Sequence, residues 1–319
     1  MTSGPGPGVL VLGCGSAGGR HARLLAAAGA AVSVYDPDPG RRRATAARIG
    51  ATEVSDPGAF DFDGVVVASP TARHADQVRA ALAGRAKVLV EKPMTVEPDE
   101  ARALAGVGGD RLAVAYNLRY HAPLRRLADV VASGVLGPVV SGRVWFGQWL
   151  PDWRPTEDYR LGYSARRELG GGILLDASHE LDVVRWLFGS GPFEVLGAAV
   201  DRLGPLEIDV EDTVAALLRG PAGVLVTVSL DCLSRRYRRG VEVVGTEGTV
   251  RLDWARGVLE VEGPAVLETT PADEPLEAAY AAQARAFLAW LADRGTMAVG
   301  AADGAEVVAL AGAVAAAAG

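Results

Sequence analysis

The chain has 319 residues, of which 49% are hydrophobic and 22% charged, so its length predicts two domains and its composition a globular core. A net charge of −7, from 32 Lys and Arg against 39 Asp and Glu, argues against a general nucleic-acid binder or a binder of anionic membranes. The only cysteines, Cys14 and Cys232, lie far apart, which argues against a disulfide framework or a cysteine metal site and favours a reducing cytoplasm.

Residues 1–8 are rich in glycine and proline without a basic region, so we expect a disordered lead-in rather than a secretory signal. No apolar run reaches the ~18 residues of a membrane span. Short apolar runs predict strands at 9–12, 31–35, 64–68 and 87–90, with helices at 19–29, 41–49 and 74–83. These repeated β-α-β units predict a doubly wound α/β fold, a parallel sheet with helices on both faces.

The pattern changes at about residue 120. The elements expected from there are a helix at 123–133, a strand at 139–147, an irregular aromatic stretch at 149–163, a helix at 173–188 after a glycine run, and strands at 193–201, 212–219, 223–231, 240–245 and 248–253. Strands in succession without helices predict an α+β domain with a large, mostly antiparallel open sheet. Helices at 275–293 and 303–317 close the chain.

A glycine motif directly follows the first predicted strand. Residues 13–18, Gly-Cys-Gly-Ser-Ala-Gly, form GxGxxG where a helix opens; such glycines allow a tight turn, close approach of a pyrophosphate and close packing of helix on strand. The helix N-terminus offers N–H groups to the phosphates. We therefore expect a Rossmann dinucleotide-binding domain with phosphate contacts from Gly13, Gly15, Ser16, Ala17 and Gly18.

Asp36 ends the second predicted strand, about 20 residues after the glycine motif, where such folds place a ribose-binding carboxylate. It would accept from the adenosine ribose hydroxyls and repel a 2′-phosphate, which favours NAD over NADP. The competing interpretation makes Asp36 a helix cap. Arg41, Arg42 and Arg43 could accommodate a 2′-phosphate, but we expect them on a solvated helix face.

The predicted domain division follows from these patterns. It has the lead-in at 1–8, the Rossmann domain at 9–119 and a substrate-binding and oligomerisation domain at 120–319. The last helix, 303–317, is a candidate to pack back on the first domain.

Further motifs carry a family resemblance. Glu91-Lys92-Pro93, directly after a strand and downstream of the glycine motif, resembles the Gfo/Idh/MocA family of nicotinamide-dependent sugar and cyclitol oxidoreductases. The match continues through Ser69-Pro70-Thr71 with His74, Tyr116-Asn117 with Arg119 and His121, Gly170-Gly171-Gly172 to Asp176, His179 and Asp182, Val210-Glu211-Asp212, and Val243-Val244-Gly245 with Gly248. The segment from Asp158 to Glu180 resembles a branch associated with sialic-acid or other surface-sugar pathways.

The resemblance implies ligand contacts for residues at these motifs. Cofactor contacts beyond the glycine motif and Asp36 are implied for Ser69, Pro70, Thr71, His74, Glu91, Lys92 and Asn117. Substrate contacts are implied for Asn117 and Arg119, and for the candidate acid–base residues Lys92, Asp176 and His179. Relatives cover the outer face of the second domain's sheet by self-association, so a homodimer or homotetramer is expected.

Lys92 is the expected proton acceptor. It follows a parallel strand at the carboxyl end, where such sheets bind ligands, and a lysine beside a cationic nicotinamide ring has a lowered pKa. Oxidation of a secondary alcohol needs such a base while the cofactor takes the hydride. The family's equivalent lysine is catalytic; the alternative is a strand-end lysine that reaches to water.

Asp176 and His179 are three residues apart at the start of a predicted helix, so we expect them to share a face. His179 is the expected acid–base partner of Lys92. Because the family spacing is commonly four, Asp176 is either a catalytic assistant or a helix N-terminal residue that favours the dipole. Asp182 is expected to pair with Arg185, and Glu180 to face solvent or a subunit contact.

Aromatic and arginine side chains gather in two stretches that suit a polyol or a charged sugar. In the first, candidate substrate contacts are Trp153, Arg154, Tyr159, Arg160 and Tyr163, with an interdomain loop anchored by aromatics as the alternative. The second stretch, 235–239, holds four arginines and is either solvated or bound to an anionic group, with Arg235 the candidate substrate contact. An anion role predicts that Arg235→Ala or Arg238→Ala raises KM with little change in kcat.

The four histidines are scattered, so no metal site is predicted, and His21 is expected to pack on the first helix. The predicted function is an NAD(H)-dependent oxidoreductase that transfers hydride between nicotinamide and a secondary hydroxyl or ketone of a sugar, sugar acid, nucleotide sugar or cyclitol. The alternatives are an imine or enone reductase with the same pocket, or a non-catalytic cofactor-sensing regulatory protein, which would usually lack the lysine or the histidine.

Overall fold

The computed structural model describes residues 6–58, 61–264 and 266–319, which divide into two compact units. The first unit comprises the chain up to Tyr120 together with Leu276–Val308. The second comprises His121–Pro275 and Ala309–Gly319. Each unit contains one sheet.

The first unit is built on a six-stranded sheet in the order β3-β2-β1-β4-β5-β6, and every strand pair in it is parallel. The strands are β1 (Gly8–Leu12), β2 (Ala31–Tyr35), β3 (Thr52–Glu53), β4 (Gly64–Val67), β5 (Lys87–Val90) and β6 (Leu112–Val114). This strand order, with a crossover beside β1, is that of the dinucleotide-binding Rossmann sheet. The predicted parallel sheet is confirmed.

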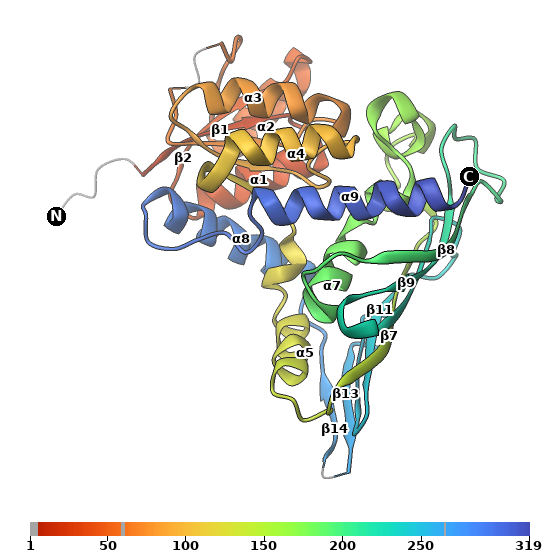
Figure 1. Cartoon of the computed structure of the whole chain (residues 1–319). Helices are drawn as coiled ribbons and strands as arrows, with labels where there is room; N and C mark the ends of the chain where they lie inside the picture. Colours follow the sequence, from red (N-terminus) through yellow and green to blue (C-terminus); the bar gives the residue numbers. More distant parts are fainter. Residues whose placement is uncertain (1–5, 59–60, 265) are drawn as a thin grey trace. The chain divides into compact units, whose positions relative to one another are not determined.

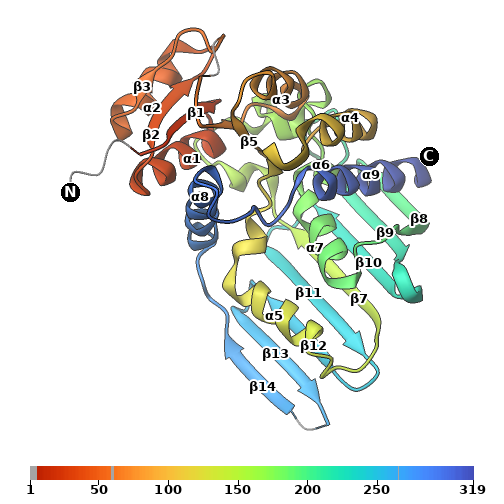
Figure 2. The same cartoon turned by 60° about the vertical axis from the view of Figure 1, so that its left-hand side comes forward.

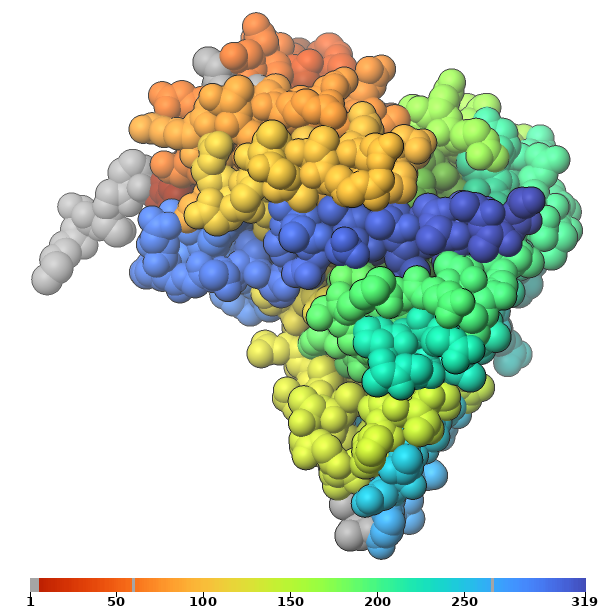
Figure 3. Space-filling view, viewed as in Figure 1, coloured from red at the N-terminus to blue at the C-terminus, as the bar shows by residue number. Residues whose placement is uncertain are grey.

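Helices cover this sheet and complete its core. They are α1 (Ser16–Ala27), α2 (Pro39–Ile49), α3 (His74–Ala83), α4 (Pro98–Gly108), α8 (Leu276–Leu291) and the first part of α9 (Ala301–Ala317). Late in the chain, α8 returns to lie beside α1, and its Phe287 and Trp290 join the core cluster around Val9 and Val11 (Figures 1 and 2). α3 and α4 lie side by side at the surface, joined by an ion pair from Arg79 to Glu100 (Figure 3).

The second unit is built on an eight-stranded sheet in the order β14-β13-β12-β11-β7-β10-β9-β8, which is antiparallel except between β7 and β10. The strands are β7 (Val139–Gly147), β8 (Glu194–Asp201), β9 (Thr213–Arg219), β10 (Leu225–Asp231), β11 (Arg238–Gly245), β12 (Thr249–Asp253), β13 (Val258–Gly263) and β14 (Val266–Pro271). Figure 2 shows α5 (Ala122–Ala132) and α7 (Ser178–Phe188) over one face. The predicted mostly antiparallel sheet is confirmed.

Some elements differ from the predictions. The helix predicted at 173–188 is two helices, α6 (Ile173–Asp176) and α7, because Ala177 between them has ψ 27°. Strands β13 and β14 and helix α4 were not predicted. Within the described part of the chain, no helix combines the length and apolar run that a membrane crossing needs.

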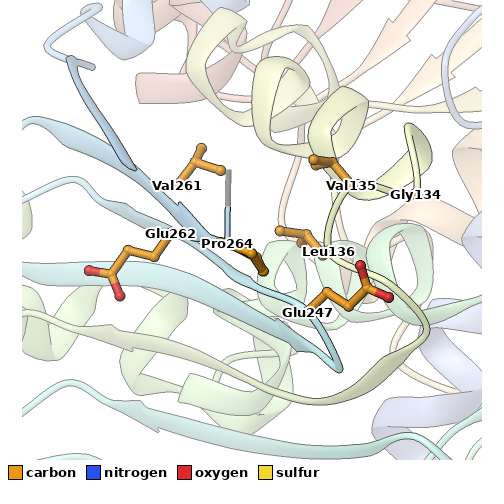
Figure 4. Close-up of a pocket in the computed structure, with 8 residues that line it drawn as sticks. Gly134, Val135, Leu136, Glu247, Val261, Glu262 and Pro264 are labelled. Atoms are coloured by element: carbon orange, nitrogen blue, oxygen red, sulfur yellow. The ribbon is translucent and has the colours of Figure 1, made fainter. Parts of the chain in front are cut away.

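A cavity of about 260 Å³ lies between the turn after α5, the turn before β12 and the end of β13. Figure 4 shows the carboxylates of Glu247 and Glu262 on opposite sides of it, with Leu136 and Pro264 between them. None of the predicted site residues lines it, so the candidate active site lies elsewhere.

Candidate active site

The carboxyl ends of β1, β4 and β5 bring three predicted cofactor segments to one edge of the parallel sheet. Leu12 is in register with Val67, which is in register with Val90. The ladder continues one residue further, with Ala68 N bonded to Leu12 O and Glu91 N to Val67 O, both at 2.8 Å. The glycine turn, the Ser69–Pro70 segment and the Glu91–Lys92 turn therefore leave the sheet side by side.

The glycine turn has the geometry of a phosphate site. Gly13 has φ 98°, and a Cβ there would lie 2.5 Å from Ala68 O. A Cβ at Gly18 would lie 1.9 Å from Gly13 O, so this glycine lets α1 pack on the turn. At Gly15 a Cβ would meet nothing within 4 Å, and Gly15 and Ser16 are exposed. No side chain caps the N-terminus of α1. Its N–H groups and the open space at Gly15 therefore fit a dinucleotide pyrophosphate.

Asp36 is buried at the end of β2 and linked to the glycine turn. Its two carboxylate oxygens accept from Cys14 N at 2.8 Å and from Asp38 N at 2.9 Å. The N-cap of α2 is Asp38, which accepts from Gly40 N and Arg41 N. Each oxygen of Asp36 keeps a further lone pair, so the carboxylate can still accept from ribose hydroxyls.

The three arginines after Asp36 differ in their surroundings. Arg41 and Arg43 are exposed, as expected, but Arg42 is not on a solvated face. Its side chain is 16% exposed, it donates to Asp36 O at 2.9 Å, and it lies 3.5 Å from the Glu53 carboxylate. Because Glu53 already neutralises Arg42, this arginine is poorly suited to receive a 2′-phosphate.

The turn after β5 carries Lys92, which is half-buried. Glu91 before it is buried, and its carboxylate accepts from His21 Nε2 at 2.8 Å and from Lys92 N at 3.0 Å. Burial pushes the pKa of Glu91 up, but the hydrogen bond and charge of His21 and the charge of Lys92 hold it below its usual value. His21, expected only to pack, is therefore a polar partner of this turn.

His74 lies between the Ser69–Pro70 segment and the same turn. Its ring is 1% exposed, with Nε2 2.9 Å from Ser69 O and Nδ1 3.0 Å from Pro93 O. Burial lowers the pKa of His74, against the opposing effect of these two carbonyls. Thr71 and Asn117 are buried in the same unit, and Arg119 is half-buried.

The residues predicted for proton transfer and substrate are divided between the units. Lys92, Asn117 and Arg119 belong to the first, and the other predicted residues to the second. There, Asp176 ends α6 and His179 lies in the first turn of α7, both buried. The two residues do not lie on one continuous helix, as was expected, because Ala177 interrupts it. The Tyr163 hydroxyl donates to Asp176 Oδ1.

Glu211 is a neighbour of Asp176 that sequence reasoning missed. Its Oε1 accepts from Leu174 N at 3.1 Å, at the start of α6. Burial raises the pKa of Glu211, and the charge of Asp176 adds to this. Gly172, with φ 109°, packs against it, since a Cβ there would lie 2.2 Å from Glu211 Oε1. Glu211 stood in a family motif, but nothing in its spacing indicated a contact at α6.

The aromatic stretch, which includes η4 (Leu150–Trp153) and η5 (Tyr159–Leu161), is tied together by its own polar groups. Trp153 Nε1 donates to Gln148 O at 3.1 Å, and the Tyr159 hydroxyl accepts from Glu207 N at 3.2 Å. Arg160 is bound to Asp158 through two nitrogens, which raises the pKa of Arg160 further. Arg154 instead lies over the Tyr163 ring, 5.7 Å from its centroid.

The arginine run at 235–239 is divided between structural and exposed side chains. Arg239 is buried and pairs with Glu180 at 2.7 Å, so the expectation that Glu180 faces solvent or a subunit contact is wrong. Arg238 pairs with Asp231 at 2.5 Å. Arg235 is exposed and stacks on Trp149, 3.5 Å from the ring centroid.

Arg235 and Arg238 should therefore respond differently to alanine. We expect Arg235→Ala to raise KM for an anionic substrate about 10-fold with kcat unchanged, because a charge-assisted hydrogen bond contributes about 1.5–3 kcal/mol. Arg238→Ala should mainly lower thermal stability, since it frees Asp231 from its partner. Steady-state kinetics measure the change in KM and thermal denaturation measures the change in stability, with exposed Arg236→Ala as the control. An unchanged KM in Arg235→Ala would exclude an anion contact there.

In the described residues, no group of three or more His, Cys, Asp or Glu side chains is arranged to hold a metal ion. The strand order, the open glycine turn and the buried Asp36 define a dinucleotide-binding Rossmann protein with a second, sheet-based unit.

Comparisons with known proteins give the family. Residues 8–107 match "Oxidoreductase family, NAD-binding Rossmann fold", and residues 124–251 match "GFO/IDH/MocA C-terminal domain". The chain belongs to the Gfo/Idh/MocA family, and its first unit contains an NAD-binding Rossmann domain.

Several similar proteins are named as enzymes of sugars or cyclitols. An inositol 2-dehydrogenase from Acidothermus cellulolyticus is 30% identical over 264 residues, covering 76% of this chain and 71% of that protein. A 1,5-anhydro-D-fructose reductase from Ensifer adhaerens is 31% identical over 201 residues, covering 62% of this chain but only 58% of that protein. The solved structure of GenD2 from gentamicin A biosynthesis, in complex with NAD, has a TM-score of 0.84 at 27% identity and covers 100% of this chain and 96% of that one.

Proposed function

We propose that this chain is an NAD(H)-dependent oxidoreductase acting on a secondary hydroxyl, or the matching ketone, of a sugar, sugar acid, nucleotide sugar or cyclitol. The observation that supports the proposal is the shared sheet edge, where β1, β4 and β5 end in register and the Ser69–Pro70 segment lies between the glycine turn and the Glu91–Lys92 turn. Relatives named as a cyclitol dehydrogenase and a sugar reductase support the substrate class.

The chain's own residues would hold the cofactor and move the proton. Gly13, Gly15 and the first turn of α1 would hold the pyrophosphate, and Asp36 the adenosine ribose. Bound NAD accepts the hydride. Lys92 would take the hydroxyl proton, because the cationic nicotinamide ring disfavours a second positive charge beside it.

His179 is the second proposed acid–base group, since an imidazole can exchange protons near neutral pH. Asp176 is proposed to assist rather than to act as the primary base. Its Oδ1 accepts a hydrogen bond from the Tyr163 hydroxyl, which holds the side chain in place.

The cofactor preference is proposed to be NAD over NADP, and Asp36 provides a test. We expect Asp36→Ala to weaken NADH binding about 10-fold and to narrow its advantage over NADPH, because hydrogen bonds to a charged group contribute about 1.5–3 kcal/mol. Titration of intrinsic NADH fluorescence measures both affinities. Asp38→Ala is the matched control, since it removes the cap of α2 but no proposed ribose contact. Equal NADH affinity in wild type and Asp36→Ala would contradict the assignment.

The proposed activity is tested by NAD⁺ reduction across a panel of cyclitols, neutral sugars, sugar acids and nucleotide sugars. Turnover of at least one class, with specificity well above the others, is the expected result. Oxidation of NADH by cyclic imines or enones alone would instead support the imine or enone reductase. Stoichiometric NADH binding without turnover of any compound would favour the regulatory alternative.

A homodimer or homotetramer is part of the proposal. Leu217 and Leu225 are 38% and 39% exposed on the strands β9 and β10, on the face opposite the buried Leu218 and Val226. Exposed leucines on neighbouring strands are suited to contact with a partner. Size-exclusion chromatography with light scattering measures the assembly, and a monomer at all concentrations would contradict it.

A further inference from the structure

Two buried histidines contact the residues before and after Lys92. His21 comes from α1, and its side chain is 4% exposed. Through Glu91 it is connected to the Lys92 backbone: the two carboxylate oxygens of Glu91 accept from His21 Nε2 and from Lys92 N, at 2.8 and 3.0 Å. One buried carboxylate thus links the first Rossmann helix to the peptide of the proposed base.

The second contact fixes the residue after Lys92. The ring of His74 at the start of α3 reaches the carbonyl of Pro93 with one nitrogen and that of Ser69 with the other. Lys92 therefore lies between two anchored neighbours, with Glu91 held by its side chain and Pro93 by its carbonyl.

The orientation of the His21 ring is itself supported. The ring of Tyr280 on α8 meets it edge-on, with centroids 6.5 Å apart and planes at 84°. Arg20 covers the same tyrosine, 4.4 Å from its centroid. A histidine that served packing alone would need neither the carboxylate partner nor this orientation, because an apolar side chain could fill the space.

We propose that His21 and His74 are positioning residues, which act on the reaction by fixing the backbone on either side of Lys92. The proposal rests on the proposed role of Lys92 as proton acceptor. Reacting groups must be held within fractions of an ångström, and a displacement of about 1 Å can lower a rate about 10²-fold. Neither histidine has to touch the substrate for this effect.

The first test is kinetic and uses conservative rescue. We expect His21→Leu and His74→Leu each to lower kcat about 10-fold or more, with the NADH dissociation constant unchanged in His21→Leu. His21→Gln, which retains an N–H donor toward Glu91, should recover most of kcat. If His21 acts through Glu91, the double variant His21→Leu/Glu91→Gln should be no slower than the slower single variant.

Leu104 on α4 of the same unit is the control for lost packing, since it is fully buried and has no proposed ligand contact. Leu104→Ala should lower thermal stability without changing kcat per folded molecule. A wild-type kcat in both His21→Leu and His74→Leu would overturn the proposal.

The second test needs no substrate, because Lys87 and Lys92 are the only lysines in the chain. Reductive ¹³C-methylation gives each a separate NMR signal, and Lys87 serves as an internal reference, fixed by Asp293 and the Trp290 carbonyl. We expect the chemical shift and titration of Lys92 to change in His21→Leu and to return in His21→Gln, while Lys87 stays constant. An unchanged Lys92 signal in both leucine variants would overturn the positioning role, even if no sugar is a substrate. Wild-type protein that turns over no compound of the panel would reject only the proposed function.

Discussion

Replacing Lys92 with methionine should lower the rate of hydride transfer by about 10²–10⁴-fold while NADH still binds. Methionine keeps the length and apolar stem of lysine, so it removes the proton acceptor without opening a large space. The glycine turn and Asp36, which hold the cofactor in the proposed function, directly follow β1 and β2 and are untouched. Single-turnover measurement of NADH formation reports the chemical step, and NADH fluorescence reports binding.

The other lysine supplies the control for this result. Lys87 begins β5, the strand that Lys92 follows, and donates to Trp290 O at 2.6 Å. Lys87→Met should therefore reduce stability but leave hydride transfer in the folded enzyme near the wild-type rate. Retained turnover in Lys92→Met, with Lys87→Met equally active, would remove Lys92 from the reaction.

Local sequence signals predicted most of the fold. The strands at 31–35, 87–90 and 139–147 were predicted with the bounds that the structure shows, because each is an apolar or alternating run next to turn residues. Strands β13 and β14 were missed because glutamate and threonine interrupt their apolar positions. Helix α4 had usable signals, with Pro98 at its first position and two acidic residues in its first turn.

The sequence predicted which residues belong to the candidate site, but not which side chains they contact. Motifs identified Glu91, Lys92 and His74, yet the partner of Glu91 lies 70 residues earlier in the chain. No spacing rule relates two side chains that only the folding of the sheet brings together. The same holds for Glu180 and Arg239, which are 59 residues apart. Glu180 in the first turn of a helix is usually solvated, so its burial follows from tertiary packing alone.

That buried pair leads to the largest stability effect we expect. Glu180 is 2% exposed and Arg239 is 7% exposed. The guanidinium carbon of Arg239 lies 5.3 Å from the ring centroid of Phe146 and 5.8 Å from that of Trp254. Burial would lower the pKa of Arg239, but the charges and hydrogen bonds of Glu180 and Tyr237 together raise that pKa, so the guanidinium stays charged. Glu180→Ala would leave this charge buried beside two aromatic rings and should destabilise the second unit by about 3–5 kcal/mol.

Urea denaturation with tryptophan fluorescence measures this loss, and two further variants show its origin. The pair of exposed Arg143 and half-buried Glu242 lies on the same sheet in contact with solvent, so Glu242→Ala should lower stability by less than about 1 kcal/mol. The double variant Glu180→Leu/Arg239→Met should recover much of the stability lost in Glu180→Ala, because it removes both charges and keeps apolar volume. If the double variant is instead less stable than Glu180→Ala, the buried charge is not the cause, and the lost packing of α7 on the sheet is.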